Sequence, residues 1–155
     1  MLAGIALAYS ELPLELVERH GLQRRVHERG GEAEVQLLLC DRDRILPVWL
    51  DGQLQMVRWG NRRGQSRSLP FTAWTRMETV ESGGWGDQES VLVLIKASMG
   101  LDEGIWYRIR QGVRGLLVRD ESGTPVVYVL VEPASHYYQV MTRSSWMPIL
   151  VGERI

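Results

Sequence analysis

Short apolar runs rich in β-branched residues recur along the chain, with turn-forming residues between them, and they limit the folds open to it. The runs at 45–50 and 53–59 flank Asp51-Gly52, a dipeptide typical of a two-residue hairpin turn. The expected strands are 35–39, 45–50, 53–59, 91–95, 105–109, 113–119, 125–131 and 137–142. Strands at this spacing predict a β-rich α+β fold built on a curved mixed sheet or partial barrel.

A few short helices are expected beside the strands. Ser10 and Pro13 mark the start of the first helix, and Gly21 suits the position after its end. A helical turn is expected at 77–80, after a polar surface loop at 60–68. The length of 155 residues is sufficient to bury a hydrophobic core without a disulfide or a metal, so we expect one domain, 1–155.

The chain offers few residues for metal or redox chemistry. Cys40 is the only cysteine, and His20, His27 and His136 are too scattered to complete a zinc site with it. Cys40 is expected to pack inside an apolar strand, because free cysteine is among the most buried residue types. We expect no metal and no cofactor. The apolar start at 1–8 is too short to span a membrane and lacks the features of a signal peptide, which favours a cytoplasmic protein without membrane contact.

One segment differs sharply in charge from the rest of the chain. The net charge is only −1, which argues against a protein that coats nucleic acid through bulk charge. The stretch 53–77 nevertheless contains five arginines and no Asp or Glu, with Trp59 and Trp74 among them. Guanidinium groups interleaved with aromatic rings favour binding of single-stranded nucleic acid. The alternative is a solvated loop beside two core tryptophans. The five arginines are Arg58, Arg62, Arg63, Arg67 and Arg76.

Four motifs in this order resemble those of a known family. They are Arg58-Trp59-Gly60, Arg76-Met77-Glu78-Thr79-Val80, Ala97-Ser98-Met99-Gly100-Leu101-Asp102-Glu103 and Trp146-Met147-Pro148-Ile149-Leu150. They resemble the RWG, NARxETV, ASGFYEW and HxRMPxIL motifs of the SRAP family, the SOS-response-associated peptidases, also described as abasic-site processing proteins. The opening residues 1–6 resemble the start of that family in layout. The resemblance covers most of the chain and implies an SRAP-like fold.

The resemblance also implies that the family's covalent chemistry is lost. In the family, a cysteine after the initiator methionine becomes the N-terminus and traps the aldehyde of an abasic site through its amine and thiol. Here that position is Leu2, and a bulky second residue implies that Met1 is retained. The family's active-site Asn falls on Trp74 and its catalytic His falls on Ser144. Only Glu103 matches a catalytic position of the family, that of the carboxylate that transfers protons. Because the motif contains one inserted residue, the comparison leaves open a shift of this position by one residue.

The positions that line the family's DNA groove are better retained than the reaction centre. Arg58, Trp59 and Arg76 match such positions, and we include Arg62, Arg63, Arg67 and Glu78 from the same segment as candidate DNA-binding residues. The aromatic pair that follows the RWG motif in the family falls near Gln65 and Ser66, and the family's segment beyond the MP motif has no counterpart. Part of one groove wall is therefore expected to be missing.

Three functions remain open from the sequence. The first is non-covalent binding of single-stranded, abasic or otherwise damaged DNA by an SRAP-like domain. The second is a protein-interaction or assembly module that keeps only the fold and forms an oligomer, which Trp74 in place of Asn favours. The third is an enzyme with relocated machinery, such as Cys40 with His136, which requires the two side chains to meet within hydrogen-bonding distance.

Overall fold

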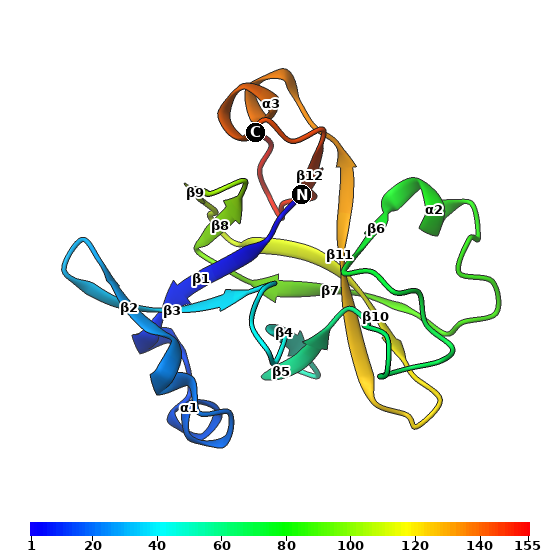
Figure 1. Ribbon diagram of the computed structural model, residues 1–155, viewed down its shortest axis with the longest axis horizontal. Coiled ribbons are helices and arrows are strands. Elements are labelled where there is room, and N and C mark those ends of the chain that lie inside the picture. The colour runs from blue at the N-terminus through cyan, green and yellow to red at the C-terminus, as the bar shows by residue number, and fades with distance from the viewer.

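A computed structural model describes residues 1–155 and divides the strands between two sheets (Figure 1). The first sheet is antiparallel, with five strands in the order β2-β3-β1-β8-β9. Their bounds are β1 Gly4–Ala8, β2 Val26–Arg29, β3 Glu32–Leu38, β8 Met99–Asp102 and β9 Ile105–Arg108. β1 pairs with both β3 and β8, so the start of the chain is held in the middle of this sheet.

The second sheet closes into a five-stranded mixed barrel in the order β10-β7-β4-β5-β11, with β11 pairing back to β10. The bounds are β4 Ile45–Leu50, β5 Gln53–Trp59, β7 Val91–Lys96, β10 Gly112–Arg119 and β11 Pro125–Pro133. Two further strands, β6 (Trp74–Arg76) and β12 (Trp146–Pro148), pair with the C-terminal half of β11 and extend the sheet beyond the barrel.

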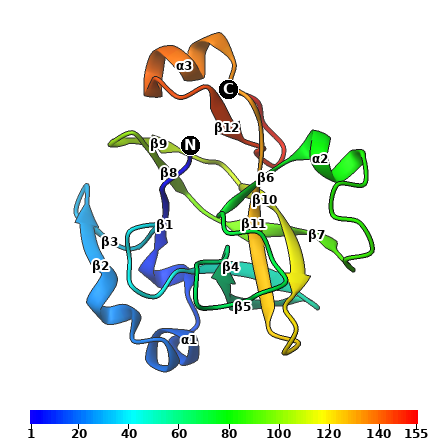
Figure 2. The same ribbon diagram turned by 45° about the vertical axis from the view of Figure 1, so that its right-hand side comes forward.

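Three short α-helices and two 3₁₀ turns complete the fold. They are α1 Leu14–Arg19, α2 Met77–Glu81, α3 His136–Thr142, η1 Tyr9–Glu11 and η2 Leu22–Arg25. α1 and α3 lie at opposite ends of the molecule in both views, and the two chain termini lie near α3 (Figures 1 and 2). None of these helices has the length and apolar character needed to cross a bilayer.

The β-rich α+β class expected from the sequence is confirmed. The hairpin between β4 and β5 follows from Asp51-Gly52, whose φ angles of +52° and +75° are the left-handed values that a type I′ turn requires. Between β10 and β11, the side chain of Asp120 accepts hydrogen bonds from the N–H groups of Ser122 and Thr124 and fixes the expected five-residue turn.

Two local predictions are wrong. The segment 137–142, expected as a strand, lies in α3. The Ser135 hydroxyl accepts a hydrogen bond from the Tyr138 N–H, and this helix cap overrides the β-propensity of the residues that follow. Cys40 is not inside a strand: β3 ends at Leu38, and Cys40 is exposed in the turn that follows. Asp41 Oδ2 accepts the Leu38 N–H and turns the chain there.

The two sheets share one hydrophobic core. A cluster of 28 buried residues contains side chains from both sheets, among them Leu2 and Trp59. A second cluster of six residues lies around Leu69 and Tyr128, on the other side of β10 and β11. Because Leu2 belongs to the main core, the first residues of the chain are fixed by packing as well as by the strand pairing of β1.

Candidate functional site

The N-terminal amine of Met1 is anchored in a polar cluster built from residues far apart in the sequence. The Ala3 N–H donates to the Leu101 carbonyl at 2.7 Å, which fixes the start of the chain beside β8. The Met1 ammonium group then lies 3.2 Å from Asp102 Oδ1 and donates to Ser144 Oγ at 3.1 Å. The amine is therefore held by the end of β8 and by the segment that links α3 to β12.

Asp102 is the centre of this N-terminal cluster and is completely buried. Its Oδ1 accepts a hydrogen bond from Ser144 Oγ, and its Oδ2 accepts one from the Tyr138 hydroxyl at 2.6 Å. The Tyr138 hydroxyl also lies 3.1 Å from the Tyr107 hydroxyl. Burial raises the pKa of both phenols above the ordinary value of 10, so both remain protonated donors. All the partners of Asp102 are donors, as a buried carboxylate requires.

Leu2 and Trp74 form the other side of the N-terminal cluster. The side chain of Leu2 is fully buried in the main core. Trp74 is half-buried on β6, and its indole Nε1–H donates to the carbonyl oxygen of Leu2 at 2.9 Å. An indole can donate a hydrogen bond but cannot accept one. Position 74 therefore holds the backbone of residue 2 in place and presents no acceptor to a ligand.

Three of the residues singled out by the motif resemblance meet in this cluster. Leu2, Trp74 and Ser144 all lie around the amine of Met1. The carboxylate against the amine is Asp102, whereas the predicted residue Glu103 is exposed in the turn between β8 and β9 with a φ of +48°. The carboxylate that contacts the amine is thus the residue before Glu103, an offset of one that the inserted residue in the motif leaves open.

The N-terminal cluster lacks the groups that the family's covalent reaction requires. The only thiol belongs to Cys40, which is exposed in the turn after β3. The Ser144 hydroxyl is occupied by Asp102 and the Met1 amine, and a serine is not a general base near neutral pH. His136 is also exposed, and no hydrogen bond joins it to Cys40. The relocated catalytic pair therefore has no support in the geometry.

A groove opens on the far side of Trp74 and has a volume of about 480 Å³. Its lining residues come from β6, from the loop before β6, and from α2 with the turn that follows it. Hydroxyl, amide and indole groups line it together with a single charged residue, Arg76. We call it the β6 groove. Its lining residues are Ser68, Pro70, Thr72, Trp74, Thr75, Arg76, Thr79, Gly84, Trp85 and Gln88.

Arg76 and Trp85 are the two side chains of the β6 groove best placed to meet a ligand. The Arg76 guanidinium stacks over the Trp146 ring, 4.2 Å from its centroid, and has no carboxylate partner. Trp85 is fixed by a hydrogen bond from its indole N–H to Thr75 Oγ1 at 3.0 Å and by an edge contact with Tyr128. A stacked, unpaired guanidinium next to a fixed indole suits a phosphate and a base.

The other predicted DNA-binding residues divide into engaged and free groups. Arg58 forms an ion pair with Asp120 at 3.4 Å, and Arg62 donates to the Asp41 carbonyl at 2.6 Å. Trp59 is only 1% exposed, so its ring is not available for stacking on a base. The exposed residues whose side chains have no ion pair or hydrogen bond are Arg63, Arg67, Arg76 and Glu78. The local charge that faces solvent is therefore smaller than the sequence predicts.

The basic loop is tied to the β10–β11 turn by Glu121. This carboxylate accepts hydrogen bonds from the Ser66 and Ser68 hydroxyls and from the Arg67 N–H. These bonds, that from Ser66 above all, lower the pKa of Glu121 from its ordinary 4.5 to about 2.

We expect this loop attachment to be present above pH 4.5 and to be lost as the pH falls through about 2, because a depressed carboxyl pKa stabilises the ionised form. In NMR spectra, the amide signal of Arg67 should shift with a midpoint near pH 2. The shift should disappear in Glu121→Gln. An Arg67 signal that titrates in the same way in this variant would show that another group holds the loop.

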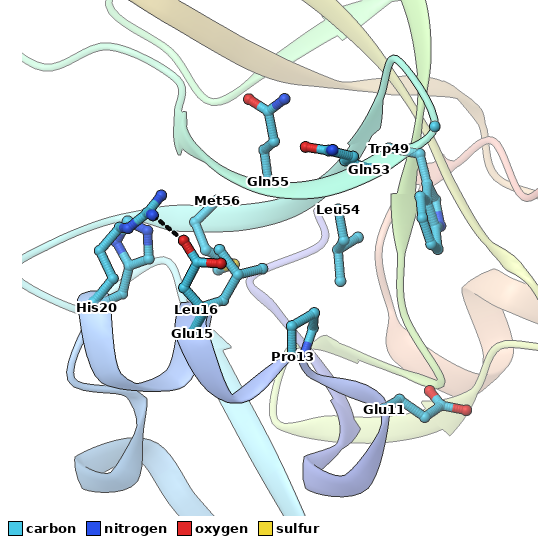
Figure 3. A pocket seen from close by; sticks show the side chains of 12 residues that line it. Glu11, Pro13, Glu15, Leu16, His20, Trp49, Gln53, Leu54, Gln55 and Met56 are labelled. Carbon is cyan, nitrogen blue, oxygen red and sulfur yellow. Dashed lines mark hydrogen bonds and ion pairs between the residues drawn. The ribbon is translucent and has the colours of Figure 1, made fainter.

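A second, larger groove of about 710 Å³ lies between α1 and the β4–β5 hairpin (Figure 3). Leu54 and Met56 of β5 point toward α1, and Glu15 and His20 lie on the helix side. None of its lining residues belongs to the N-terminal cluster or to the β6 groove.

Several site residues were not identified from the sequence. Trp85 and Trp146 lie outside the basic segment; Trp146 begins one of the four motifs, whereas only its aromatic character could point to Trp85. Asp102 stands next to the predicted Glu103, and the inserted residue in that motif was the available signal. Tyr138 was assigned to a strand, so its contact with Asp102 could not be predicted.

Comparison of the chain with protein-family models, with curated proteins and with solved structures finds no match in any of the three.

Proposed function

We propose that this protein is an SRAP-like domain that binds single-stranded or damaged DNA in the cytoplasm without forming a covalent bond to it. The observation that carries this proposal is the β6 groove, whose only charged lining residue is the unpaired Arg76, directly beside the cluster that holds the N-terminus. The resemblance to the SRAP motifs is supported by the meeting of positions 2, 74 and 144, which are far apart in the sequence.

The chemistry of the groove favours nucleic acid over an apolar ligand. A guanidinium stacked on an indole can contact a phosphate while it keeps its aromatic partner. Phe71 lies between Pro70 and Thr72, which line the groove, and is 60% exposed, so its ring can be reached by a base. Arg63 and Arg67, on the same loop, add positive charge without carboxylate partners. Single-stranded DNA uses charge for its backbone and aromatic faces for its bases.

The surroundings of the N-terminus favour reversible binding. A lasting adduct with a sugar aldehyde needs an amine and a thiol on one residue, and Met1 and Leu2 supply no thiol. The amine of Met1 donates to Ser144 and pairs with Asp102, so two groups of the protein hold it. Trp74 covers the backbone of Leu2 on the side of the β6 groove. A strand in the groove would therefore meet an indole and not a nucleophile.

The test compares Arg76→Ala with Arg24→Ala in fluorescence anisotropy titrations with a labelled single-stranded oligonucleotide. Arg24 is exposed on η2 and gives the same loss of charge outside the groove. We expect Arg76→Ala to weaken binding about tenfold and to reduce the salt dependence by about one phosphate contact, whereas Arg24→Ala stays close to the original chain.

Two results would contradict the proposal in different ways. If the original chain does not bind the oligonucleotide at low salt, or if the two variants weaken binding equally, the β6 groove is not a DNA site. If an oligonucleotide with one abasic site gives a complex that survives a denaturing gel, the binding is covalent. The argument that Leu2, in place of cysteine, abolishes the covalent reaction would then be wrong.

A second candidate function is protein interaction or assembly. It is favoured by the internal contacts of the basic segment, because Arg58 and Arg62 are engaged by Asp120 and Asp41, and Trp59 belongs to the core. This candidate predicts a chain that does not bind the oligonucleotide but associates with itself or with another protein.

A further inference from the structure

The N-terminal half of β5 has a free edge. β4 pairs with β5 along Gln53 to Arg58, but on its other side β5 pairs with β11 only at Arg58 and Trp59. The Trp59 N–H donates to the Arg44 carbonyl, and hydrogen-bonded pairs alternate along an antiparallel ladder. The backbone groups of Leu54 and Met56 therefore face away from β4, where no strand is paired with them.

This edge carries none of the usual devices that prevent pairing with another chain. Residues 53–57 contain no proline, no charged side chain and no glycine. The larger groove follows the same edge, with α1 as its opposite wall, so the edge is open to an extended strand (Figure 3). A helix facing an open strand edge is a geometry in which strands of other chains are bound.

We infer that the occupant of this edge is the β5 strand of a second copy of the chain, paired antiparallel about a twofold axis at Leu54. In this register Leu54 faces Leu54 of the second copy, and Gln53 faces Gln55 of that copy. Apolar residues thus meet on the side of α1, and amides meet on the opposite side, where both glutamines are exposed. The strand bears no charge, so the second copy is not repelled.

The length of the free edge selects this register. The paired segment would run between Gly52 and Met56, and it stops before Arg58, where β11 joins β5. A register shifted by one residue toward Trp59 would place the turn of the second copy onto β11. On the opposite wall of the groove, Glu15 and Arg19 pair with each other within one chain, so these two residues present no net charge to a second copy.

Sedimentation equilibrium over a range of concentrations tests this dimer, independently of any DNA binding. Gln53→Lys/Gln55→Lys places lysines opposite lysines across the twofold axis and should weaken the dimer at least about tenfold, because like charges face each other in cross-strand pairs. Both positions are exposed, so the fold should be kept. Gln23→Lys/Ser90→Lys adds the same charge at exposed positions outside β5 and should leave the dimer unchanged.

The register gives a second, sharper arm. Gln53→Glu/Gln55→Glu should also be monomeric alone, whereas an equal mixture of the Lys and Glu variants should form a heterodimer, because each lysine then faces a glutamate. A chain that remains monomeric at every concentration would overturn the inference and leave the edge to a different extended peptide. A Lys variant that dimerises like the original chain, or a mixture that does not associate, would overturn it as well.

Discussion

Replacing Asp102 with Asn should lower the free energy of unfolding by about 3 kcal/mol, because it removes one member of a buried ion pair. Asp102 is completely buried and accepts hydrogen bonds from Ser144 and Tyr138 while it pairs with the Met1 amine. An amide of the same shape keeps one acceptor and adds two donors, so donors then face donors and the ammonium group loses its counter-charge. Urea unfolding at pH 7 measures the loss.

Glu103→Gln is the matched control for Asp102→Asn. It makes the same chemical change one residue further along, at an exposed side chain without a partner, and should alter stability by less than about 0.5 kcal/mol. If the two variants lose similar stability, the cluster around the N-terminus is not the stabilising feature described above. If Glu103→Gln alone is destabilising, the carboxylate assigned from the sequence motif has a role that its exposed position does not reveal.

Much of the barrel could be predicted because its signals are local. β4 and β5 were predicted with their observed bounds, since Asp51-Gly52 determines both the turn and the length of the strands on each side. β1 and β6 were not predicted. β1 is formed by small and apolar residues whose pairing partners, Leu38 and Leu101, are distant in the sequence. Such pairing depends on the whole fold and leaves little trace in a short window of sequence.

The N-terminal cluster could be predicted only in part, and the reason lies in side-chain direction. The motif comparison located Leu2, Trp74 and Ser144, but it assigned the carboxylate to Glu103. Because the strand β8 ends at Asp102, two neighbouring positions of the motif have opposite surroundings, one buried and one exposed. Asp102 faces the core, and Glu103 begins the turn to β9.

The charge of the basic segment could be counted from the sequence, but its availability could not. Arg58 pairs with Asp120 of the β10–β11 turn, more than 50 residues later in the chain, and Arg62 donates to the Asp41 carbonyl. The side chains of Arg63, Arg67 and Arg76 have no carboxylate partner, and of these Arg76 stacks on Trp146 of β12. The tertiary structure thus selects one arginine of five as the groove's only charge.

Raising the pH above 10 should destabilise the protein steeply, and Tyr138→Phe should reduce the steepness. Burial raises the pKa values of Tyr107 and Tyr138 above 10, so the folded chain keeps both protons while the unfolded chain releases them. The stability due to this effect is complete below pH 10 and is lost as the pH rises above it, by about 1.4 kcal/mol per pH unit for each tyrosine.

At pH 7, Tyr138→Phe should cost about 1–3 kcal/mol, because Asp102 loses a donor in a buried site. Between pH 10 and 11 its stability should fall less steeply than that of the original chain, so the two curves of unfolding free energy against pH converge. Tyr137→Phe changes the neighbouring side chain, which is 65% exposed, and should leave both the neutral-pH stability and the slope unchanged. Parallel curves for Tyr138→Phe and the original chain would mean that the Tyr138 hydroxyl ionises as readily in the folded as in the unfolded chain. That result would contradict the burial of this hydroxyl against Asp102.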